Sequence, residues 1–89
     1  MEKKIKSIDN GKDIKFTMKT LTMPIKEEFN DAFSEAEFAK PVKYSLWTKC
    51  ARIATEITDD DMLNMTDMDL YQIVYECAIL INCKKKSKK

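Results

Sequence analysis

The sequence predicts an α+β fold that is mainly α, with an N-terminal β-hairpin followed by three to four helices in a small bundle. An Asn-Gly pair separates two short segments near the N-terminus, and this dipeptide is a strong hairpin signal. Later segments repeat apolar residues at helical spacing. Since 89 residues suffice for one domain but not for two, we expect a single domain over residues 1–83.

The hairpin is expected over about residues 3–21, with strands at 3–8 and 13–21. In the second strand, apolar residues alternate with lysine and threonine, which is the period of a half-buried strand. Asn10 and Gly11 lie between the strands, and both residue types tolerate a positive φ angle. A lone hairpin is marginal in water, so this one must pack on the helices or pair with another chain.

The first helix is expected over about residues 24–39, with Thr22 as its cap and Pro24 in its first turn. It should end before Pro41, because the residue preceding a proline disfavours the helical conformation. A second helix is expected over 41–57, where apolar residues recur at steps of about four. These residues are Val42, Leu46, Cys50, Ile53 and Ile57.

Thr58 and Thr66 are each followed by acidic residues, a pattern typical of a capped helix start. The first predicts a short helix over 59–64, and the second predicts the last helix over 67–83. This last helix is apolar nearly all round, so we expect it to be central or covered by a partner. The lysine-rich tail at 84–89 is expected to be disordered.

The composition argues against an enzyme. With no histidine, neither a Cys–His nor a Ser–His pair can be built. Cys50 and Cys77 lie on predicted buried faces, where cysteine packs as a small hydrophobic residue, whereas Cys83 could be more exposed. Gly11 is the only glycine, so the chain lacks a glycine-rich phosphate loop. We therefore expect no catalytic residues and no cofactor.

No metal site is expected either. Zinc needs closely paired cysteine or histidine ligands, but the three cysteines lie at positions 50, 77 and 83 and the sequence has no histidine. The acidic run that starts at Asp59 does not fit a calcium loop, which needs glycine at its sixth position and glutamate at its twelfth. Those positions hold Asn64 and Leu70.

Charge and cysteine content predict a cytoplasmic protein. The formal net charge is +1, so no overall field attracts polyanions. An odd number of cysteines and a polar N-terminus argue against a disulfide framework and a signal peptide. The longest nearly apolar stretch, residues 73–83, is too short to span a bilayer, so we expect no membrane partner.

Candidate partner-binding residues are aromatic, isoleucine and methionine side chains of the predicted helices, because such side chains adapt to apolar partners. Core packing is the alternative reading for the methionines and for two of the phenylalanines. A homo-oligomer is also possible. The candidates are Phe29, Phe33, Phe38, Tyr71, Tyr75, Ile79, Met62 and Met65.

The lysine tail is a candidate for contact with nucleic acid or with an acidic protein surface. Its lysines are Lys84, Lys85, Lys86, Lys88 and Lys89. Base readout favours Arg, Asn and Gln on an ordered element, and the tail offers none of these. Composition therefore favours a solvated terminus over a nucleic-acid site.

The order of these segments resembles the small tail assembly chaperones of tailed bacteriophages. In that family a β segment precedes helices, and an acidic stretch leads into a final apolar helix. The resemblance covers residues 14–81 and is one of layout, not of a diagnostic motif. It is carried by KFTMKTL at 15–21, ARIATEI at 51–57, TDDDMLNM at 58–65 and DMDLYQIV at 67–74.

The resemblance implies a protein-binding assembly factor in the host-cell cytoplasm, without enzymatic activity. Proteins of this family coat the long helical tape-measure protein and help to recruit tail-tube subunits. Two other functions stay open. One is a structural virion or adaptor subunit with a permanent interface, and the other is a small nucleic-acid-binding regulator that uses the lysine tail.

Overall fold

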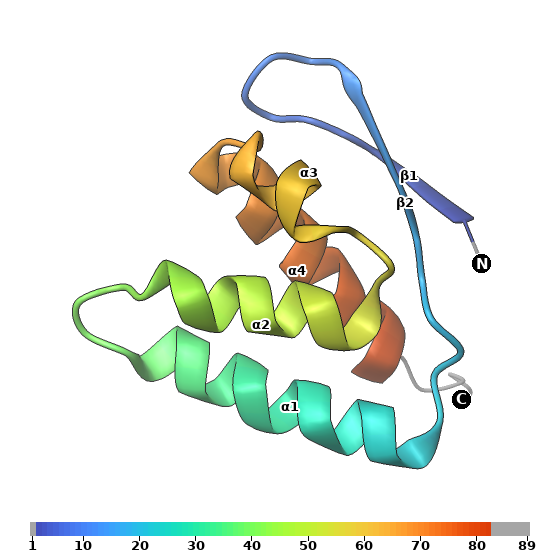
Figure 1. Ribbon diagram of the computed structural model, residues 1–89, viewed down its shortest axis with the longest axis vertical. Helices are drawn as coiled ribbons and strands as arrows, with labels where there is room; N and C mark the ends of the chain where they lie inside the picture. Colours follow the sequence, from blue (N-terminus) through green and yellow to red (C-terminus); the bar gives the residue numbers. More distant parts are fainter. Residues whose placement is uncertain (1, 83–89) are drawn as a thin grey trace, which may run out of the picture.

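Figure 1 shows the computed structural model of the protein, which describes residues 2–82. Strands β1 (Glu2–Lys6) and β2 (Asp13–Thr17) form an antiparallel hairpin. Four helices follow in the described part of the chain, and the predicted α+β, mainly α class is confirmed. They are α1 (Met23–Phe38), α2 (Tyr44–Ala54), α3 (Asp59–Leu63) and α4 (Asp67–Asn82).

Helices α1, α2 and α4 pack on one another. Helices α1 and α2 lie side by side, and both contact α4 behind them (Figure 1). The hairpin lies on the other side of the bundle from α1, and β2 leads down past the end of α2 to the start of α1. The largest fully buried side chains come from β2's extension, from α1 and from the helices that follow: Phe29, Met18, Ile73, Val74, Thr55, Cys50 and Cys77.

The hairpin loop is longer than an Asn-Gly turn. Ser7 N donates to Lys12 O at 2.8 Å, and Gly11 N donates to Ser7 O at 2.9 Å. Gly11 has a φ of 75°, while no other residue among 2–82 has a positive φ. Asn10 instead accepts a hydrogen bond from Lys12 N on its side-chain Oδ1. The glycine alone therefore provides the left-handed conformation that the loop requires.

Strand β2 ends at Thr17 and not near residue 21 as predicted. Beyond Thr17 the chain leaves β1 and pairs with the segment that follows α2, where Met18 forms an isolated antiparallel bridge with Thr55. Glu56 N donates to Thr17 O at 2.8 Å, and Lys19 N donates to Ala54 O at 2.9 Å. The alternating residues that predicted one long strand therefore pair with two different segments, first with β1 and then with the segment after α2.

Helix α2 is shorter at both ends than the predicted 41–57. It begins at Tyr44 because Lys43 has an extended backbone with φ −115° and ψ 111°. It ends at Ala54 because Thr55 is extended, with φ −127° and ψ 171°, and joins the bridge to β2. The apolar spacing continues to Ile57, but backbone pairing with β2 overrides the helical periodicity.

The other helix bounds lie close to the predictions, and the caps differ. Helix α1 starts at Met23, and the Thr22 side chain makes no capping hydrogen bond. Thr58 does cap α3, since its Oγ1 accepts from Asp61 N at 3.2 Å. Thr66 Oγ1 likewise accepts from Asp69 N at the start of α4 at 3.3 Å. Cys83 and the lysine tail lie outside the described residues.

Candidate protein-binding site

Helix α4 has two apolar faces, of which the structure buries one. Leu70, Ile73, Val74, Cys77 and Ile81 are in the core. Met68, Tyr75 and Ile79 are 43%, 45% and 63% exposed. Their spacing places these three side chains along one side of the helix. Helix α4 therefore presents a second apolar stripe that the rest of the domain leaves uncovered.

A groove of about 430 Å³ runs between this stripe and the hairpin. Ile5 on β1 and Ile8 in the hairpin loop form its other wall, and Ile8 is 71% exposed. The polar residues in the groove are Gln72 and Glu76. Its apolar lining consists of Ile5, Ile8, Met68, Tyr71, Tyr75 and Ile79. We call this surface the α4 groove.

Gln72 joins the two walls of the α4 groove. Its Oε1 accepts a hydrogen bond from Ile8 N at 2.9 Å, and its Nε2 donates to Lys6 O at 2.6 Å. Lys3 Nζ and Glu76 Oε2 are 3.8 Å apart, which adds an ion pair between β1 and α4. These contacts hold the edge of β1 beside the exposed stripe of α4.

A buried polar pair fixes the hairpin loop on the first turn of α4. Ser7 Oγ donates to Asp69 Oδ1 at 2.6 Å, and both residues are buried. Ser7 Oγ also accepts from Asp9 N and Asn10 N, at 3.1 Å and 3.3 Å. Buried polar groups are costly unless they are hydrogen-bonded, so this pair sets the position of the loop on α4.

An aromatic cluster lies beneath the groove. Trp47 of α2 packs against Tyr71 and Tyr75, with ring centroids 4.9 Å and 5.5 Å apart. Phe33 meets Tyr75 edge-on at 5.4 Å. The Tyr44 hydroxyl donates to Asp67 Oδ2 at 3.0 Å, and this bond raises the pKa of Tyr44 to about 12. The rings make a well-packed floor, because such pairs contribute beyond their buried area.

The structure brings together only part of the predicted set. Tyr71, Tyr75 and Ile79 line the α4 groove. Phe33 is half-buried beneath it, in the aromatic cluster. Phe38 is exposed at the end of α1 and lines a different, shallow depression beside Lys40. Met65 is half-buried, and the tail lysines lie outside the described residues.

Phe29 and Met62 are corrections to the predicted set. They are 0% and 7% exposed, so neither side chain can contact a partner in this fold. Phe29 stacks on Phe33 within the core, and Met62 faces inward from α3. Sequence reasoning missed Ile5, Ile8 and Met68, although Ile5 and Ile8 lie in the predicted first strand. Their grouping depends on contacts between segments more than sixty residues apart in the chain.

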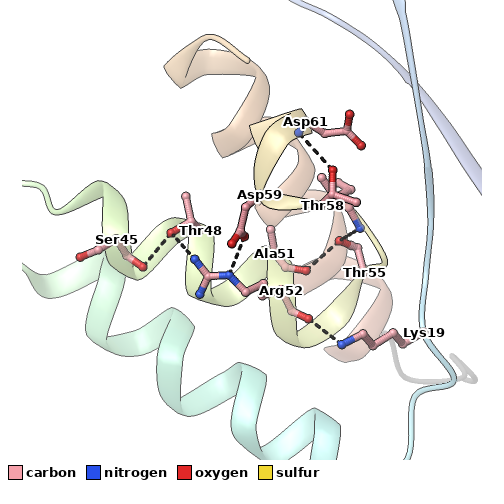
Figure 2. A network of polar contacts seen from close by, with 10 residues as sticks. Lys19, Ser45, Thr48, Ala51, Arg52, Thr55, Thr58, Asp59 and Asp61 are labelled. Atoms are coloured by element: carbon pink, nitrogen blue, oxygen red, sulfur yellow. Dashed lines mark hydrogen bonds and ion pairs between the residues drawn. The ribbon is translucent and has the colours of Figure 1, made fainter. Parts of the chain in front are cut away.

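The other edge of the hairpin is held by a separate polar network (Figure 2). Lys19 Nζ donates to Arg52 O at 2.8 Å, and Arg52 Nε donates to Asp59 Oδ1 at 3.0 Å. The buried Thr55 hydroxyl donates to Ala51 O at 2.7 Å. This network connects the extension of β2 with the end of α2 and the start of α3.

The arrangement offers no reactive thiol or metal cluster within residues 2–82. Burial raises the pKa of the Cys50 thiol to about 11 and that of Cys77 to about 12, so both stay protonated at neutral pH. No cluster of three or more cysteine, aspartate or glutamate residues in that range could hold a metal ion. None of the described helices has the length and apolar character needed to cross a membrane.

Comparison with protein families, with characterised proteins and with solved structures gives no match to this chain.

Proposed function

We propose that this protein is a non-enzymatic assembly factor that binds a segment of another protein in the α4 groove. One observation carries the proposal: Met68, Tyr75 and Ile79 on α4 join Ile8 in one exposed apolar surface. Contiguous apolar surfaces rimmed by polar residues are typical of interaction sites. The rings of Phe33 and Trp47 pack against Tyr75 and keep this surface in place, so it is a built feature of the fold.

The proposal extends to the class of factor that the sequence resembles, a phage tail assembly chaperone. Such a factor must cover apolar segments of a long partner weakly and repeatedly. Methionine and tyrosine both suit this task. Methionine adapts to several partners, and tyrosine combines an apolar body with a polar tip. Met68 and Tyr75 supply these side chains in the α4 groove.

The test is co-purification of the full-length, tagged protein from its source cells during assembly. In the double variant Tyr75→Lys and Ile79→Lys, we expect loss of a stoichiometric protein partner. Leu63→Lys is the matched control, because Leu63 is 83% exposed on α3 and lies outside the α4 groove. Circular dichroism should show that both variants are folded, since all three side chains are exposed.

Retention of the partner by the folded double variant would refute the proposed surface. Light scattering over a range of concentrations separates the chaperone from a structural subunit. A chaperone gives a concentration-dependent mixture of monomer and oligomer, whereas a structural subunit keeps the same oligomer at every dilution.

A further inference from the structure

The backbone of β1 points half of its hydrogen-bonding groups away from β2. Ser7 N bonds to Lys12 O, and the register pairs Ile5 with Ile14 and Lys3 with Phe16. Backbone groups alternate in direction along an antiparallel strand. The N–H and C=O groups of Glu2, Lys4 and Lys6 therefore form the outer edge of β1.

The two outer edges of the hairpin are used differently. Beyond the middle of β2, Thr17 O and Lys19 N are bonded to the backbone of Glu56 and Ala54, whereas the outward backbone groups of Asp13 and Lys15 have no such bond within residues 2–82. Along the outer edge of β1 and the loop that follows it, the only group within residues 2–82 that hydrogen-bonds to the backbone is the side-chain amide of Gln72. It accepts from Ile8 N and donates to Lys6 O, as a peptide group of a neighbouring strand would. Lys4 N and Lys4 O have no partner in that range.

We propose that the outer edge of β1 and the α4 groove together bind an extended, acidic segment of a partner protein as a third strand. This inference rests on the function proposed above and specifies how the same surface binds. Strand addition combines main-chain hydrogen bonds with pockets for alternate side chains. Here the open edge at Lys4 supplies the bonds, and the α4 groove supplies the pocket.

The side chains of β1 specify an alternating partner sequence. Ile5 and Ser7 face the domain, whereas Glu2, Lys4 and Lys6 are exposed on the opposite side of the strand. An added strand has the same pleat, so its residues beside Ile5 cover the exposed stripe of α4 and must be apolar. Its residues beside Lys4 and Lys6 face solvent, where acidic side chains form favourable cross-strand pairs. Such a pair adds to the exposed ion pair that Lys4 Nζ already makes with Asp13 Oδ2 at 3.8 Å across the hairpin.

The same lysines disfavour a second copy of this chain as the occupant. An antiparallel pairing of two β1 strands about Ile5 would place Lys4 opposite Lys6 at two positions. A pairing about Lys4 would place the two Lys4 residues opposite each other, although Glu2 would then face Lys6. Like charges directly opposite each other destabilise a sheet, and edge lysines are a common protection against self-pairing. Opposite charge in the partner removes this penalty, which is why we assign the edge to an acidic segment.

The experiment titrates the full-length protein with a seven-residue peptide of alternating glutamate and valine, blocked at both ends. Isotope-edited NMR should show hydrogen-exchange protection at the Lys4 and Lys6 amides together with shifts at Tyr75 and Ile79. A matched peptide with N-methyl groups on alternate residues has the same side chains but cannot donate along one edge. We expect it to bind at least about tenfold more weakly.

Two further probes test the edge and the charge separately. Lys4→Pro removes an outward N–H that β2 does not use, and proline is tolerated at such edge positions. We expect this variant to fold and to lose the peptide, while Lys4→Thr keeps binding. Replacing glutamate by lysine in the peptide should weaken binding at least about tenfold, and the difference should shrink in high salt.

Equal binding of the methylated peptide, or tighter binding of an amphipathic helical peptide in the same groove, would overturn strand addition while leaving the proposed function intact. If the protein dimerises and Lys4→Pro abolishes the dimer, the outer edge of β1 binds a second copy of the chain. That result would overturn the proposal of an acidic partner segment. If Lys4→Pro does not fold, the methylated peptide still decides the question. The proposed function fails separately, when the double variant at Tyr75 and Ile79 keeps its natural partner.

Discussion

The two edges of the hairpin face different environments. The edge of β2 continues into backbone pairing with the segment after α2, and the network around Arg52 and Thr55 supports that junction (Figure 2). The edge of β1 is held to α4 by side chains: Ser7 with Asp69, Gln72 with the strand backbone, and Lys3 with Glu76. Beside it lies the exposed apolar stripe of α4.

The difference shows how a very small domain can use one side of a hairpin for stability and the other side for binding. A domain of this size buries only about 60% of its unfolded surface, so it needs every backbone pairing it can form. The end of β2 and its extension meet that need within the chain, through Thr17 and Lys19. Within residues 2–82, the β1 edge keeps the backbone groups of Lys4 unpaired next to apolar surface, which is the combination that a binding strand requires.

The largest effect on stability is expected for Met18→Ala, which removes a buried side chain from the extension of β2. Met18 is 2% exposed, bridges Thr55 and contacts Cys77 Sγ through its sulfur at 3.6 Å. Losing this side chain leaves a cavity, so we expect the free energy of unfolding to fall by about 2–5 kcal/mol in urea titrations. Met23→Ala is the matched control, because Met23 is 74% exposed. Equal effects of the two substitutions would contradict the buried position of Met18.

A smaller loss of stability is expected for Ser7→Ala, which affects the contact between the hairpin loop and α4. The variant leaves the buried Asp69 carboxylate without the hydroxyl that donates to it at 2.6 Å. An unsatisfied buried polar group costs about 1–3 kcal/mol. Ser34→Ala is the control, since Ser34 is exposed on α1. A loss larger than that of Met18→Ala would reverse the comparison, because the β1 side would then be the more strongly held edge.

Thr55→Val tests the hydrogen bonds at the junction itself. The Thr55 hydroxyl donates to Ala51 O and accepts from Ile57 N at 3.2 Å. Valine keeps the shape and removes both bonds, so we expect a loss of about 1 kcal/mol in thermal or urea unfolding. Thr20→Val, at an exposed position, should change the stability much less. An unchanged stability for Thr55→Val would mean that backbone pairing alone holds the β2 edge.

The smallest effect is expected for Arg52→Ala. Arg52 and Asp59 form an exposed ion pair at 3.0 Å, and such pairs contribute about 0.2–1 kcal/mol. The difference between variant and parent should decrease in concentrated salt, which screens exposed charges. A loss that salt leaves unchanged would show that Arg52 acts through packing of its aliphatic stem on α2.

Much of the fold follows from local patterns in the sequence. Gly11 predicts the loop because only a glycine adopts its positive φ without cost, and it does so here. Thr58 predicts the start of α3 because its side chain can accept from the third residue of the helix, which it does. The candidate site was predicted in part, through Tyr71, Tyr75 and Ile79, and missed Ile8 and Met68.

The sequence by itself determined that a hairpin precedes helices, that the last helix is apolar on nearly every side, and that the 89 residues include no histidine. Only the tertiary structure decided which side of α4 is buried and which forms a groove with β1. It also decided that α2 stops at Ala54 and that Gln72 covers a strand edge. Periodicity describes a helix by itself, whereas burial depends on neighbours that lie far away in the chain.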